Sequence, residues 1–408
     1  MPGPLQGIVV LDLSRVLAGP WATQALADYG AEVIKIEKPG TGDDTRQWGP
    51  PWLKDTAGRD TAESAYYLST NRGKKSVAID LAHPDGQDLV RQLARGADVV
   101  VENFKVGGLA KYGLAYADIG AINARAIYLS ISAFGQDGPD AAGPGYDAAI
   151  QGMGGLMSLT GVPEGEPGAG PQKVGVALAD LMCGMYAVAS VLAALFERQQ
   201  SGRGQYIDLA LLDTQVAWLA NQSMNYLIGG VVPQRRGTAH PNIVPYQSFS
   251  TADGYLMLSV GNDGQFTRFC AAAGQPQLAA DPRYATNQGR VANRAELVPQ
   301  VQQLLRARST SDWLTRLRAA NVPCGPINDL AQVFAEPQVR HRAMRIDLPH
   351  PMSGSVPGVR NPAVFSRTPL EYRRAPPPLG ADTESVLREK LGLERVRLDE
   401  LRKNGAIG

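Results

Sequence analysis

The sequence has few residues that could form disulfides or bind metals. It contains three cysteines and four histidines in 408 residues. The cysteines, Cys183, Cys270 and Cys324, are odd in number, widely spaced and without a C-x-x-C pair, which indicates reduced thiols rather than a disulfide framework or zinc site. The histidines form no H-E-x-x-H motif. We therefore expect a cytoplasmic protein that needs no metal.

The sequence also lacks an excess of charge of one sign. Its formal net charge is +1, so nothing in the electrostatics favours nucleic acid or an anionic membrane as partner. The first residues show no basic segment followed by an apolar one, as an export signal would. The longest apolar run, residues 181–196, is short for a bilayer and rich in small residues, so we expect a buried helix.

Several familiar nucleotide and hydrolase motifs are missing. The run Gly152-Met153-Gly154-Gly155 has no third glycine at the required spacing and no strand before it, so it fails as a dinucleotide fingerprint. Residues 73–76, Gly-Lys-Lys-Ser, lack the first glycine of a P-loop, and no G-x-S-x-G motif occurs. We expect neither a nicotinamide cofactor nor ATP.

What the first half of the chain does have is alternation of strand-like and helix-like segments. Strand-like runs occur at 8–13, 31–36, 76–81, 98–102 and 126–131, with helices predicted at 21–29 and after residues 83–86, His-Pro-Asp-Gly. This alternation predicts an α/β fold with a large, Rossmann-like parallel-sheet domain and helices on both faces. Residues 134–175 are dense in glycine and proline, and such long irregular segments commonly serve a binding site.

The remaining chain predicts a second, smaller α+β domain. A strand at 203–209 precedes one long helix at 212–228, followed by a hairpin (246–249 and 255–260) and helices that begin at 265, 294 and 311. A return strand at 322–327 and a helix at 382–391 lead back. We therefore expect residues 1–210 to form the N-terminal part of the large domain, 211–229 a linker helix, 230–325 the small domain, and 326–408 a linker and C-terminal part that rejoins the large domain.

One acidic residue, Asp180, interrupts the apolar stretch KVGVALADLMCGMYA (173–187). Its carboxylate could be the N-cap of the following helix, where it would accept hydrogen bonds from free N–H groups. It could also be a nucleophile, because a helix N-terminus favours the ionised carboxylate and leaves an oxygen at the mouth of a Gly-rich loop. The two interpretations are compatible.

Several motifs in a fixed order make the chain resemble the class III CoA-transferases of the CaiB/BaiF type. They are LDLSRVLAGPWATQALADYGAEVIKIEKPGTGDDTR, NRGKKSVAIDL, VENFKVGGLAKYGL, AGPGYDAAIQGMGGLMSLTG, ALADLMCGMYA, GTAHPNIVPYQSF and VPCGPINDL. The resemblance implies that Asp180, in the family's D-x-x-x-G motif with Gly184, is the covalent nucleophile. It also implies acyl-CoA and free carboxylic acids as substrates, and an interlocked homodimer.

The same resemblance suggests the other site residues. The N–H groups of Leu17 and Ala18 would stabilise the oxyanions, although an ordinary strand-to-helix turn would look the same. Residues that would contact CoA are Val16, Lys38, Asn103, Phe104, Lys111, Tyr146 and Asp147, where the alternative for the lysines is a solvated surface. Trp48 and Tyr66 would line the acyl group, or would simply be core aromatics.

Within this family, GDDTRQWGPP, NYLIGG, GTAHPNIVPYQSF and VFAEPQV resemble the succinyl-CoA:glutarate CoA-transferases. Arg236 and His240 could supply a cation for the far carboxylate of a dicarboxylic acid, or equally be a surface charge and a turn. Residues 261–266, GNDGQF, depart from the glycine run of oxalate-using relatives. We expect transfer from succinyl-CoA to glutarate. The alternatives are another acid (itaconate, citramalate, mesaconate, malate, an aromatic succinate, or oxalate with formyl-CoA), an acyl-CoA racemase, or a CoA-binding protein without catalysis.

Overall fold

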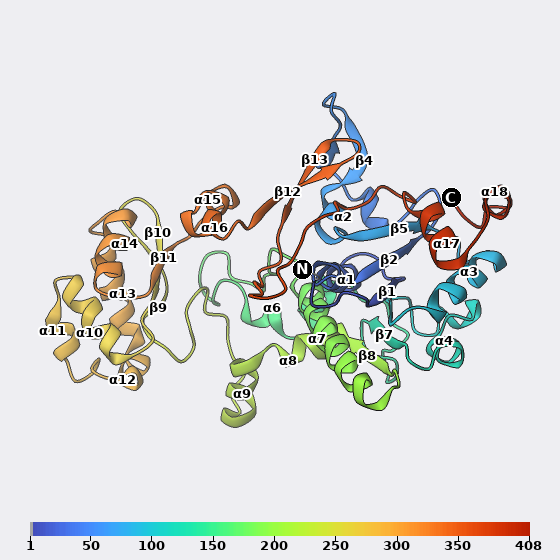
Figure 1. Cartoon of the computed structure of the whole chain (residues 1–408). Coiled ribbons are helices and arrows are strands. Elements are labelled where there is room, and N and C mark those ends of the chain that lie inside the picture. Colours follow the sequence, from blue (N-terminus) through green and yellow to red (C-terminus); the bar gives the residue numbers. More distant parts are fainter. Residues whose placement is uncertain (1–2) are drawn as a thin grey trace. The chain divides into compact units, whose positions relative to one another are not determined.

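A computed structural model of the chain describes residues 3–408, which form two compact units (Figure 1). The large unit comprises the residues up to Leu156 together with Lys173–Val231 and Arg340–Gly408. The small unit comprises Met157–Gln172 and Val232–Val339. The large unit thus collects three stretches of the sequence. The domain boundaries expected from the sequence stay a prediction.

Six parallel strands form the central sheet of the large unit. In spatial order they are β5 (Lys74–Ala78), β2 (Glu32–Glu37), β1 (Val9–Asp12), β6 (Val99–Glu102), β7 (Ile127–Ser132) and β8 (Tyr206–Ala210). In the register of the sheet, Val10 of β1 lies beside Val33 of β2 and Val99 of β6. The predicted parallel α/β architecture is confirmed.

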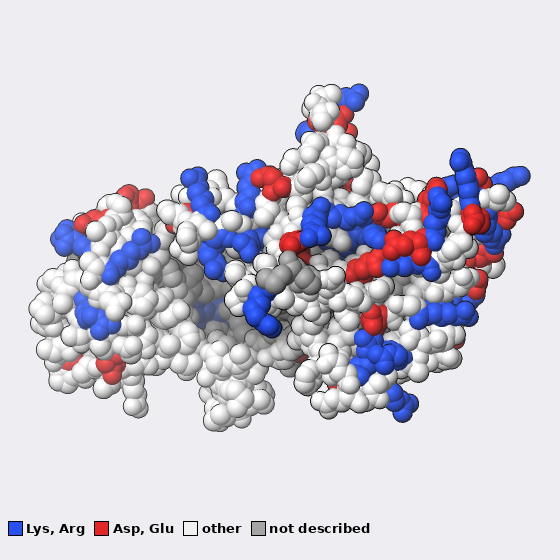
Figure 2. Space-filling model, viewed as in Figure 1, with Lys and Arg blue, Asp and Glu red and all other residues white. Residues whose placement is uncertain are grey.

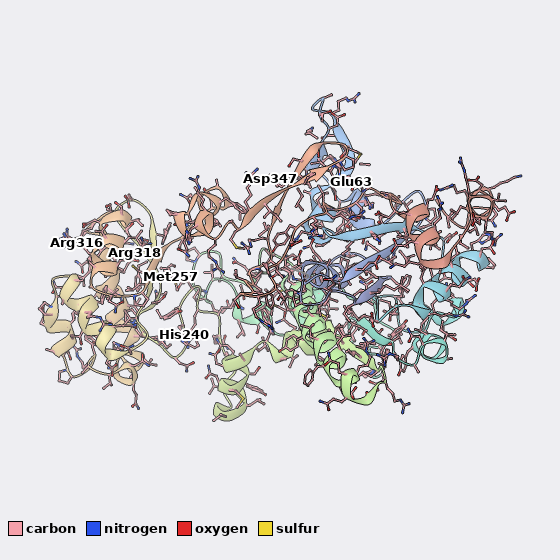
Figure 3. The ribbon with its side chains drawn as sticks, in the orientation of Figure 1. Glu63, His240, Met257, Arg316, Arg318 and Asp347 are labelled. Carbon is pink, nitrogen blue, oxygen red and sulfur yellow. The ribbon has the colours of Figure 1, made fainter. Side chains whose placement is uncertain are left out.

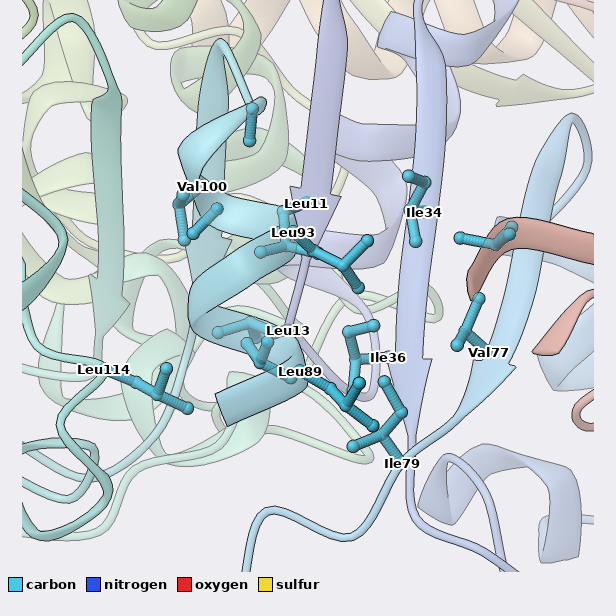
Figure 4. Packing of buried hydrophobic residues seen from close by; sticks show 14 of the residues in the cluster. Leu11, Leu13, Ile34, Ile36, Val77, Ile79, Leu89, Leu93, Val100 and Leu114 are labelled. Atoms are coloured by element: carbon cyan, nitrogen blue, oxygen red, sulfur yellow. The ribbon is translucent and has the colours of Figure 1, made fainter. Parts of the chain in front are cut away.

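Helices cover both faces of this sheet, as the sequence predicts. One face packs against α3 (Pro84–Arg95), α4 (Tyr116–Ile122), α17 (Thr383–Leu391) and α18 (Arg395–Lys403). The other packs against α1 (Ala18–Asp28), α5 (Asp147–Met153), α7 (Leu178–Ser201) and α8 (Leu211–Ala217). Figure 4 shows the first face, where Leu93 of α3 lies beside Leu11 of β1 and Leu89 of α3 lies near Leu13. Because both sides of the strands are buried, they read as nearly continuous apolar runs.

The outer edge of β5 is covered by the last part of the chain. The backbone N–H of Ser76 donates to the Asp382 carboxylate at 3.0 Å, and the Asp382 N–H donates back to the Ser76 carbonyl at 2.9 Å. The N–H of Gly408 donates to the carbonyl of Ala78 at 3.0 Å. An exposed edge would offer these groups to other chains. Here residues about 300 positions away satisfy them.

The C-terminal helices on this side of the large unit carry charges of both signs. Figure 2 shows Lys and Arg side chains intermixed with Asp and Glu side chains around α17 and α18. Arg402 pairs with Glu384 at 3.0 Å and Arg397 pairs with Asp85 of α3 at 3.2 Å. Opposite charges therefore compensate one another locally on this face.

Smaller elements complete the chain outside the core of the small unit. They are the 3-10 helices η1 (Asp44–Gln47) and η2 (Ala110–Tyr112), the antiparallel pair β3 (Trp52–Lys54) and β4 (Asp60–Ser64), the helices α2 (Ala65–Thr70), α6 (Leu156–Leu159), α9 (Ala220–Gly229) and α16 (Pro337–His341), and the antiparallel pair β12 (Arg345–His350) and β13 (Gly354–Val359). The sequence interpretation missed both antiparallel pairs, because the strands β3, β4 and β13 have no regular apolar alternation and β12 has only two alternating apolar residues, Ile346 and Leu348.

The small unit has a three-stranded antiparallel sheet surrounded by helices. Its sheet order is β11 (Cys324–Pro326), β10 (Tyr255–Ser259) and β9 (Tyr246–Ser250). Its helices are α10 (Asp263–Ala272), α11 (Pro276–Ala280), α12 (Asn287–Ala292), α13 (Arg294–Leu305), α14 (Thr310–Ala319) and α15 (Leu330–Ala335). The predicted hairpin is confirmed: the Thr251 N–H donates to the Gly254 carbonyl across the turn at 2.9 Å.

Four sequence expectations about elements are corrected. The long helix expected at 212–228 is two helices, α8 and α9, because the chain breaks at residues 218–219 and Ala220 has a positive φ of 44°. The helix expected from residue 21 begins at Ala18, since a first turn tolerates Pro20. The segment 134–175 contains α5 and α6, and β5 begins two residues before the predicted strand.

Among the described residues, α7 is the one helix long and apolar enough to cross a membrane. It packs against α1, α5, α8 and β7 of the large unit. It buries Ala179, Ala187, Val188 and Val191 in the core. The predicted buried helix is therefore confirmed, and α7 is a core helix of the large unit.

Candidate active site

A cavity lies at the carboxyl ends of the central strands. The strands β2 and β5 lie on one side of β1, and β6, β7 and β8 lie on the other, so the strand order reverses between β1 and β6. Ligands of open α/β sheets bind at such a switch point. Here a cavity of about 230 Å³ is lined by residues 15–18 after β1, residues 103–106 after β6, the end of β7, and Asp180 of α7.

Asp180 lies in the first turn of α7 and lines this cavity. The prediction that it is the N-cap is wrong, because the N-cap is Ala177 and Asp180 is the third helical residue. Burial, followed by the negative charge of Asp147, raises the pKa of Asp180 to about 7. A carboxylate with a pKa near neutrality is a better nucleophile than an ordinary one, and such shifts are typical of functional sites.

The capping role expected for Asp180 is carried by Asp147 instead. One carboxylate oxygen of Asp147 accepts a hydrogen bond from the Ala179 N–H at 2.8 Å. Its other oxygen accepts from the Gln151 side-chain amide at 2.8 Å, and the Gln151 carbonyl oxygen accepts from the Val174 N–H at 3.0 Å. Asp147 thus satisfies one of the free N–H groups at the start of α7 from a different helix, α5. Spacing along the sequence could not reveal this.

Gly184, one helical turn after Asp180, lies where α7 packs closely against α1. A Cβ atom at this position would lie 2.9 Å from the carbonyl oxygen of Ala18 and 3.0 Å from Cδ1 of Trp21. The absence of a side chain therefore allows α7 to approach α1 closely. This close packing brings the first turn of α7, with Asp180, against the start of α1, with Ala18.

We expect Gly184→Ala to lower the enzymatic activity that the family resemblance implies about tenfold and to reduce the free energy of unfolding by about 1–3 kcal/mol. The added methyl group forces α1 and α7 apart, and misplacing reacting groups by a fraction of an ångström slows a reaction sharply. Steady-state kinetics and urea unfolding measure the two effects.

The matched control is Gly120→Ala on α4, where a Cβ atom would meet nothing closer than 3.9 Å. That change should leave activity unchanged and stabilise the helix by about 0.5–1 kcal/mol. Equal activity of Gly184→Ala and the wild type would show that the spacing of the two helices does not matter.

The turn between β1 and α1 presents backbone N–H groups to the cavity. Leu17 is the N-cap of α1 and Ala18 its first residue, and the first N–H groups of a helix have no carbonyl partner within the helix. Val16 precedes them with a φ of 71°, a left-handed conformation that is costly for a β-branched residue. All three line the same cavity as Asp180. The turn therefore offers hydrogen-bond donors beside a carboxylate that ionises near neutral pH.

Comparison with known proteins identifies this arrangement. The model of "CoA-transferase family III" matches residues 5–383. The chain belongs to CoA-transferase family III. It is 52% identical over 392 residues to "Succinate--glutarate CoA-transferase" of Agrobacterium fabrum, covering 96% of this chain and 97% of that protein. It is 44% identical over 407 residues to human "Succinyl-CoA:glutarate CoA-transferase", covering 99% of this chain and 90% of that protein.

A solved structure supports the same assignment. The crystal structure of "a CAIB/BAIF family protein from Brucella suis" is 47% identical in sequence and superposes with a TM-score of 0.84. The match covers 96% of this chain and 100% of that one. The enzyme class predicted from the motifs is thereby confirmed, and the substrates of such a CoA-transferase are an acyl-CoA and a carboxylic acid.

A second cavity of about 470 Å³ adjoins the first in this family III CoA-transferase. Both cavities are lined by Arg15, Asp44 and Phe104. The guanidinium of Arg15 lies 5.2 Å from the centre of the Phe104 ring and pairs with Asp44 at 3.1 Å. The sequence interpretation missed Arg15 and Asp44 as residues of the cavity wall, although both lie in the first of the family motifs. Other charged residues stand close to them in that motif, and the sequence does not show which of them face the cavity.

The residues predicted to contact CoA are distributed over these two cavities. Asn103, Phe104 and Tyr146 line the first cavity, and Lys38 lines the second. The Asn103 side chain exchanges hydrogen bonds with the Arg15 backbone at 2.9 and 2.7 Å. Lys111 lies outside both linings, 4.7 Å from the ring centre of Tyr112, and Tyr112 lines the second cavity. Their contacts with CoA stay predictions.

Trp48 and Tyr66, which were predicted to line the acyl group, lie outside the walls of both cavities described above, so that role stays a prediction. The rings of Trp48 and Tyr66 meet edge to face with centroids 5.1 Å apart. Burial, followed by the charges of Asp180, Asp147 and Asp43, raises the pKa of Tyr66 to about 12. The phenol of Tyr66 is therefore neutral at physiological pH and lies within the electrostatic field of Asp180.

Arg236 and His240 belong to the small unit, where Figure 3 labels His240. Nδ1 of His240 accepts a hydrogen bond from the Asn242 N–H at 3.1 Å. Burial, followed by the charge of Arg294, lowers the pKa of His240. Its imidazole is therefore neutral at pH 7 with Nε2 as the proton donor. Two cations of this region are Arg236, which is exposed, and Arg294, whereas Arg235 pairs with Glu164.

No metal site accompanies these residues. Among residues 3–408, no group of three or more His, Cys, Asp or Glu side chains is placed to hold a metal ion. The expectation that the enzyme uses neither metal, nicotinamide nor ATP stays a prediction.

Proposed function

We propose that this family III CoA-transferase moves CoA from succinyl-CoA to glutarate through a covalent aspartyl-CoA thioester on Asp180. The observation that carries the proposal is the Asp180 carboxylate, ionising near pH 7, in one cavity with the free N–H groups at the start of α1. Full-length similarity to transferases named for succinyl-CoA and glutarate supports the choice of acids.

In the first half-reaction, an oxygen of Asp180 attacks the thioester carbonyl of succinyl-CoA. The C–S bond breaks, leaving a mixed anhydride on the enzyme and a CoA thiolate. The thiolate then attacks the aspartyl carbonyl, forming a C–S bond and releasing succinate. The energy of the thioester is kept in the aspartyl-CoA, so no ATP is consumed.

The second half-reaction runs the same chemistry in reverse with a new acid. A carboxylate of glutarate attacks the aspartyl-CoA carbonyl and expels the CoA thiolate, giving a second mixed anhydride. The thiolate attacks the glutaryl carbonyl, which forms glutaryl-CoA and returns Asp180 as a carboxylate. Each carbonyl attack creates an oxyanion that the N–H groups of Leu17 and Ala18 would stabilise.

The two adjoining cavities suggest the path of CoA. The nucleotide would occupy the larger cavity, where Lys38 supplies positive charge, and the pantetheine would pass Arg15 and Phe104 to reach Asp180. Val16, Asn103, Lys111, Tyr146 and Asp147 would contact CoA or hold its surroundings. Trp48 and Tyr66 would exclude water from the anhydrides, which hydrolyse readily.

The far carboxylate of a dicarboxylic acid needs a cation, and we assign it to Arg236 with His240 as neutral donor. A side-chain nitrogen of Arg294 donates to the backbone carbonyl of Pro241 at 2.6 Å, which fixes the loop that carries His240. Burial and the charge of Arg236 lower the pKa of Arg294. The two guanidinium groups repel each other, and a bound carboxylate would offset this repulsion.

We expect glutarate to have the highest kcat/KM among the candidate acids when succinyl-CoA is the donor. We also expect Arg236→Ala to raise the KM for glutarate about ten- to hundredfold, because a charge-assisted hydrogen bond contributes about 1.5–3 kcal/mol. Butyrate, which has no second carboxylate, should react equally slowly with both enzymes. Chromatographic separation of the acyl-CoA products measures all of these rates.

The matched control is Arg316→Ala. Arg316 is an exposed arginine of the same unit, on α14, paired with Asp312 and labelled in Figure 3. Its replacement should change no kinetic constant. If another acid has a higher kcat/KM than glutarate, that acid is the acceptor and the assignment of glutarate is wrong. The acids to compare are itaconate, citramalate, mesaconate, malate, an aromatic succinate and oxalate. Exchange of the α-proton of an acyl-CoA in D₂O without CoA transfer would favour the racemase alternative.

The proposal includes an interlocked homodimer in the cytoplasm. Exposed apolar residues on and after α9, namely Leu227, Ile228 and Val231, are between 71% and 80% exposed, and such groups are typical of association surfaces. The odd number and wide spacing of the cysteines support a reducing compartment. Succinyl-CoA, glutarate and a second copy of the chain are then the partners of the enzyme.

A further inference from the structure

The turn before α1 contains a strained residue, Val16, whose conformation must be stabilised by its surroundings. Val16 is β-branched, yet its φ is 71°. Residues in such conformations persist where the surroundings over-determine them, and they cluster at functional sites. The next two residues, Leu17 and Ala18, carry the N–H groups to which the proposed function gives the oxyanion. The conformation of Val16 therefore decides where those N–H groups point.

Two buried side chains, those of Lys35 and Asp43, bind the backbone of this turn. The N–H of Val16 donates to both carboxylate oxygens of Asp43, each at 3.3 Å. The ammonium of Lys35 donates to the carbonyl of Ser14 at 2.8 Å and pairs with Asp43 at 2.9 Å. One ion pair thus binds the peptide groups on both sides of Arg15, immediately before the strained residue.

The ion pair is fully inside the protein and fully charged. The side chains of Lys35 and Asp43 are both 0% exposed. Burial opposes the ionisation of Asp43, but the charge and hydrogen bond of Lys35, with hydrogen bonds from Thr45, outweigh it and lower the pKa to about 2. Burial likewise opposes the charge of Lys35, and Asp43, Asp12 and Glu37 outweigh it and raise the pKa. Both groups therefore keep their charges throughout the physiological pH range.

From these contacts we infer that Lys35 and Asp43 are positioning residues for catalysis: their ion pair fixes the left-handed Val16 and so aims the N–H groups of Leu17 and Ala18. The inference rests on the proposed function, because it concerns the oxyanions of that reaction. Neither residue lines the cavity with Asp180. Both belong to the wall of the second cavity, but their side chains are 0% exposed, so their contacts with Ser14 and Val16 act through the backbone of the turn.

A second buried ion pair nearby provides a matched control. Arg46 pairs with Glu63, labelled in Figure 3, at 2.8 Å, and both side chains are 5% exposed. This pair lies in the same loop region, yet among the described residues the hydrogen bonds of Glu63 go to Arg46 and Thr61 and not to residues 14–18. Breaking it should disturb stability without disturbing the turn.

The test measures kcat and KM for succinyl-CoA and the rate of hydroxylamine-trapped aspartyl-CoA formation. We expect Asp43→Asn to lower kcat and the trapping rate about 10²-fold, with KM changed less than threefold, because the N–H groups act chiefly on the transition state. We expect Glu63→Gln to change kcat less than threefold, although it lowers the melting temperature. A similar loss of kcat in Glu63→Gln would overturn the inference.

Epistasis with Val16 separates positioning from a general structural role. Glycine adopts φ near 71° without strain, so a Val16→Gly turn needs less support. In the Val16→Gly background, Asp43→Asn should lower kcat by less than tenfold. Equal factors in the two backgrounds would overturn the inference, because the ion pair would then not act through the conformation of Val16.

If Asp43→Asn does not fold, the double variant Lys35→Met/Asp43→Leu replaces it, since removing both charges leaves no unpaired buried ion. The same 10²-fold loss of kcat is expected, and an unchanged kcat would overturn the inference. Failure of the proposed function is distinguishable, because it would show in the wild-type protein as absence of aspartyl-CoA before any variant is made.

Discussion

Replacing Asp180 with alanine should lower CoA transfer at least about 10⁴-fold and abolish the covalent adduct. Without the nucleophile the covalent pathway through aspartyl-CoA no longer exists. The remaining rate is that of the direct reaction between substrates that the protein binds and brings close together. Mass spectrometry after incubation with succinyl-CoA and hydroxylamine should find a hydroxamate on Asp180 in the wild type only. An adduct without glutaryl-CoA would keep the covalent mechanism and discard glutarate.

Asp180→Asn keeps the shape of the side chain and controls for folding. Since burial raises the pKa of Asp180 from 3.8 to about 7, the folded protein holds a proton that the unfolded chain has released between these values. The wild type therefore loses stability as the pH rises from about 4 to 7. The asparagine variant should be at least as stable as the wild type at pH 8, with the difference disappearing below pH 4. Loss of activity in a less stable Asp180→Asn would instead point to a structural role.

The kcat/KM for succinyl-CoA should rise about tenfold per pH unit below pH 7 and level off above it. Only the ionised Asp180 attacks, and kcat/KM reports the pKa of the free enzyme, here about 7. At pH 5 the value should be about 100-fold below the plateau. A pH–rate profile with saturating acceptor measures this.

The charge of Asp147 contributes to the position of this inflection. Asp147→Asn should move it to lower pH, because a neutral neighbour no longer opposes the ionisation of Asp180. Asp399→Asn on α18, an exposed carboxylate paired with Arg402, is the control and should leave the profile unchanged. A profile that is flat between pH 5 and 8 would contradict an ionising Asp180 in the rate-determining step.

The sequence predicts the sheet well because its signals are local. The strands β1, β2, β6 and β7 are short apolar runs, and burial on both faces gives them that composition. The break at Ala220 was not predictable in the same way, because the residues from 212 to 228 have ordinary helical patterning and the positive φ of 44° arises from the tertiary structure. The antiparallel pair β12 and β13 likewise depends on partners that local patterning does not show.

In the candidate site, too, the residues that stand in local motifs could be predicted, whereas contacts between distant segments could not. Asp180 and the turn at Leu17 and Ala18 could be found from motifs, and the structure brings both to one cavity. The N-cap role was given to Asp180 because the sequence shows only its neighbours along the chain, whereas the carboxylate that meets Ala179 comes from Asp147 of another helix. The ion pair of Lys35 and Asp43 could not be predicted for the same reason, since Lys35 interrupts the apolar run of β2, Asp43 stands in a polar loop, and only the tertiary structure brings them together.

The covering of the β5 edge has a consequence for biosynthesis. The groups that pair with Ser76 and Ala78 come from Asp382 and Gly408, which are synthesised about 300 residues later. Until then the nascent large unit carries an open sheet edge, although every residue of the small unit, which ends at Val339, has already been made. Contacts so distant in sequence close slowly, and unpaired edges aggregate. The growing chain is therefore open to edge-to-edge association until residues 382–408 have been added.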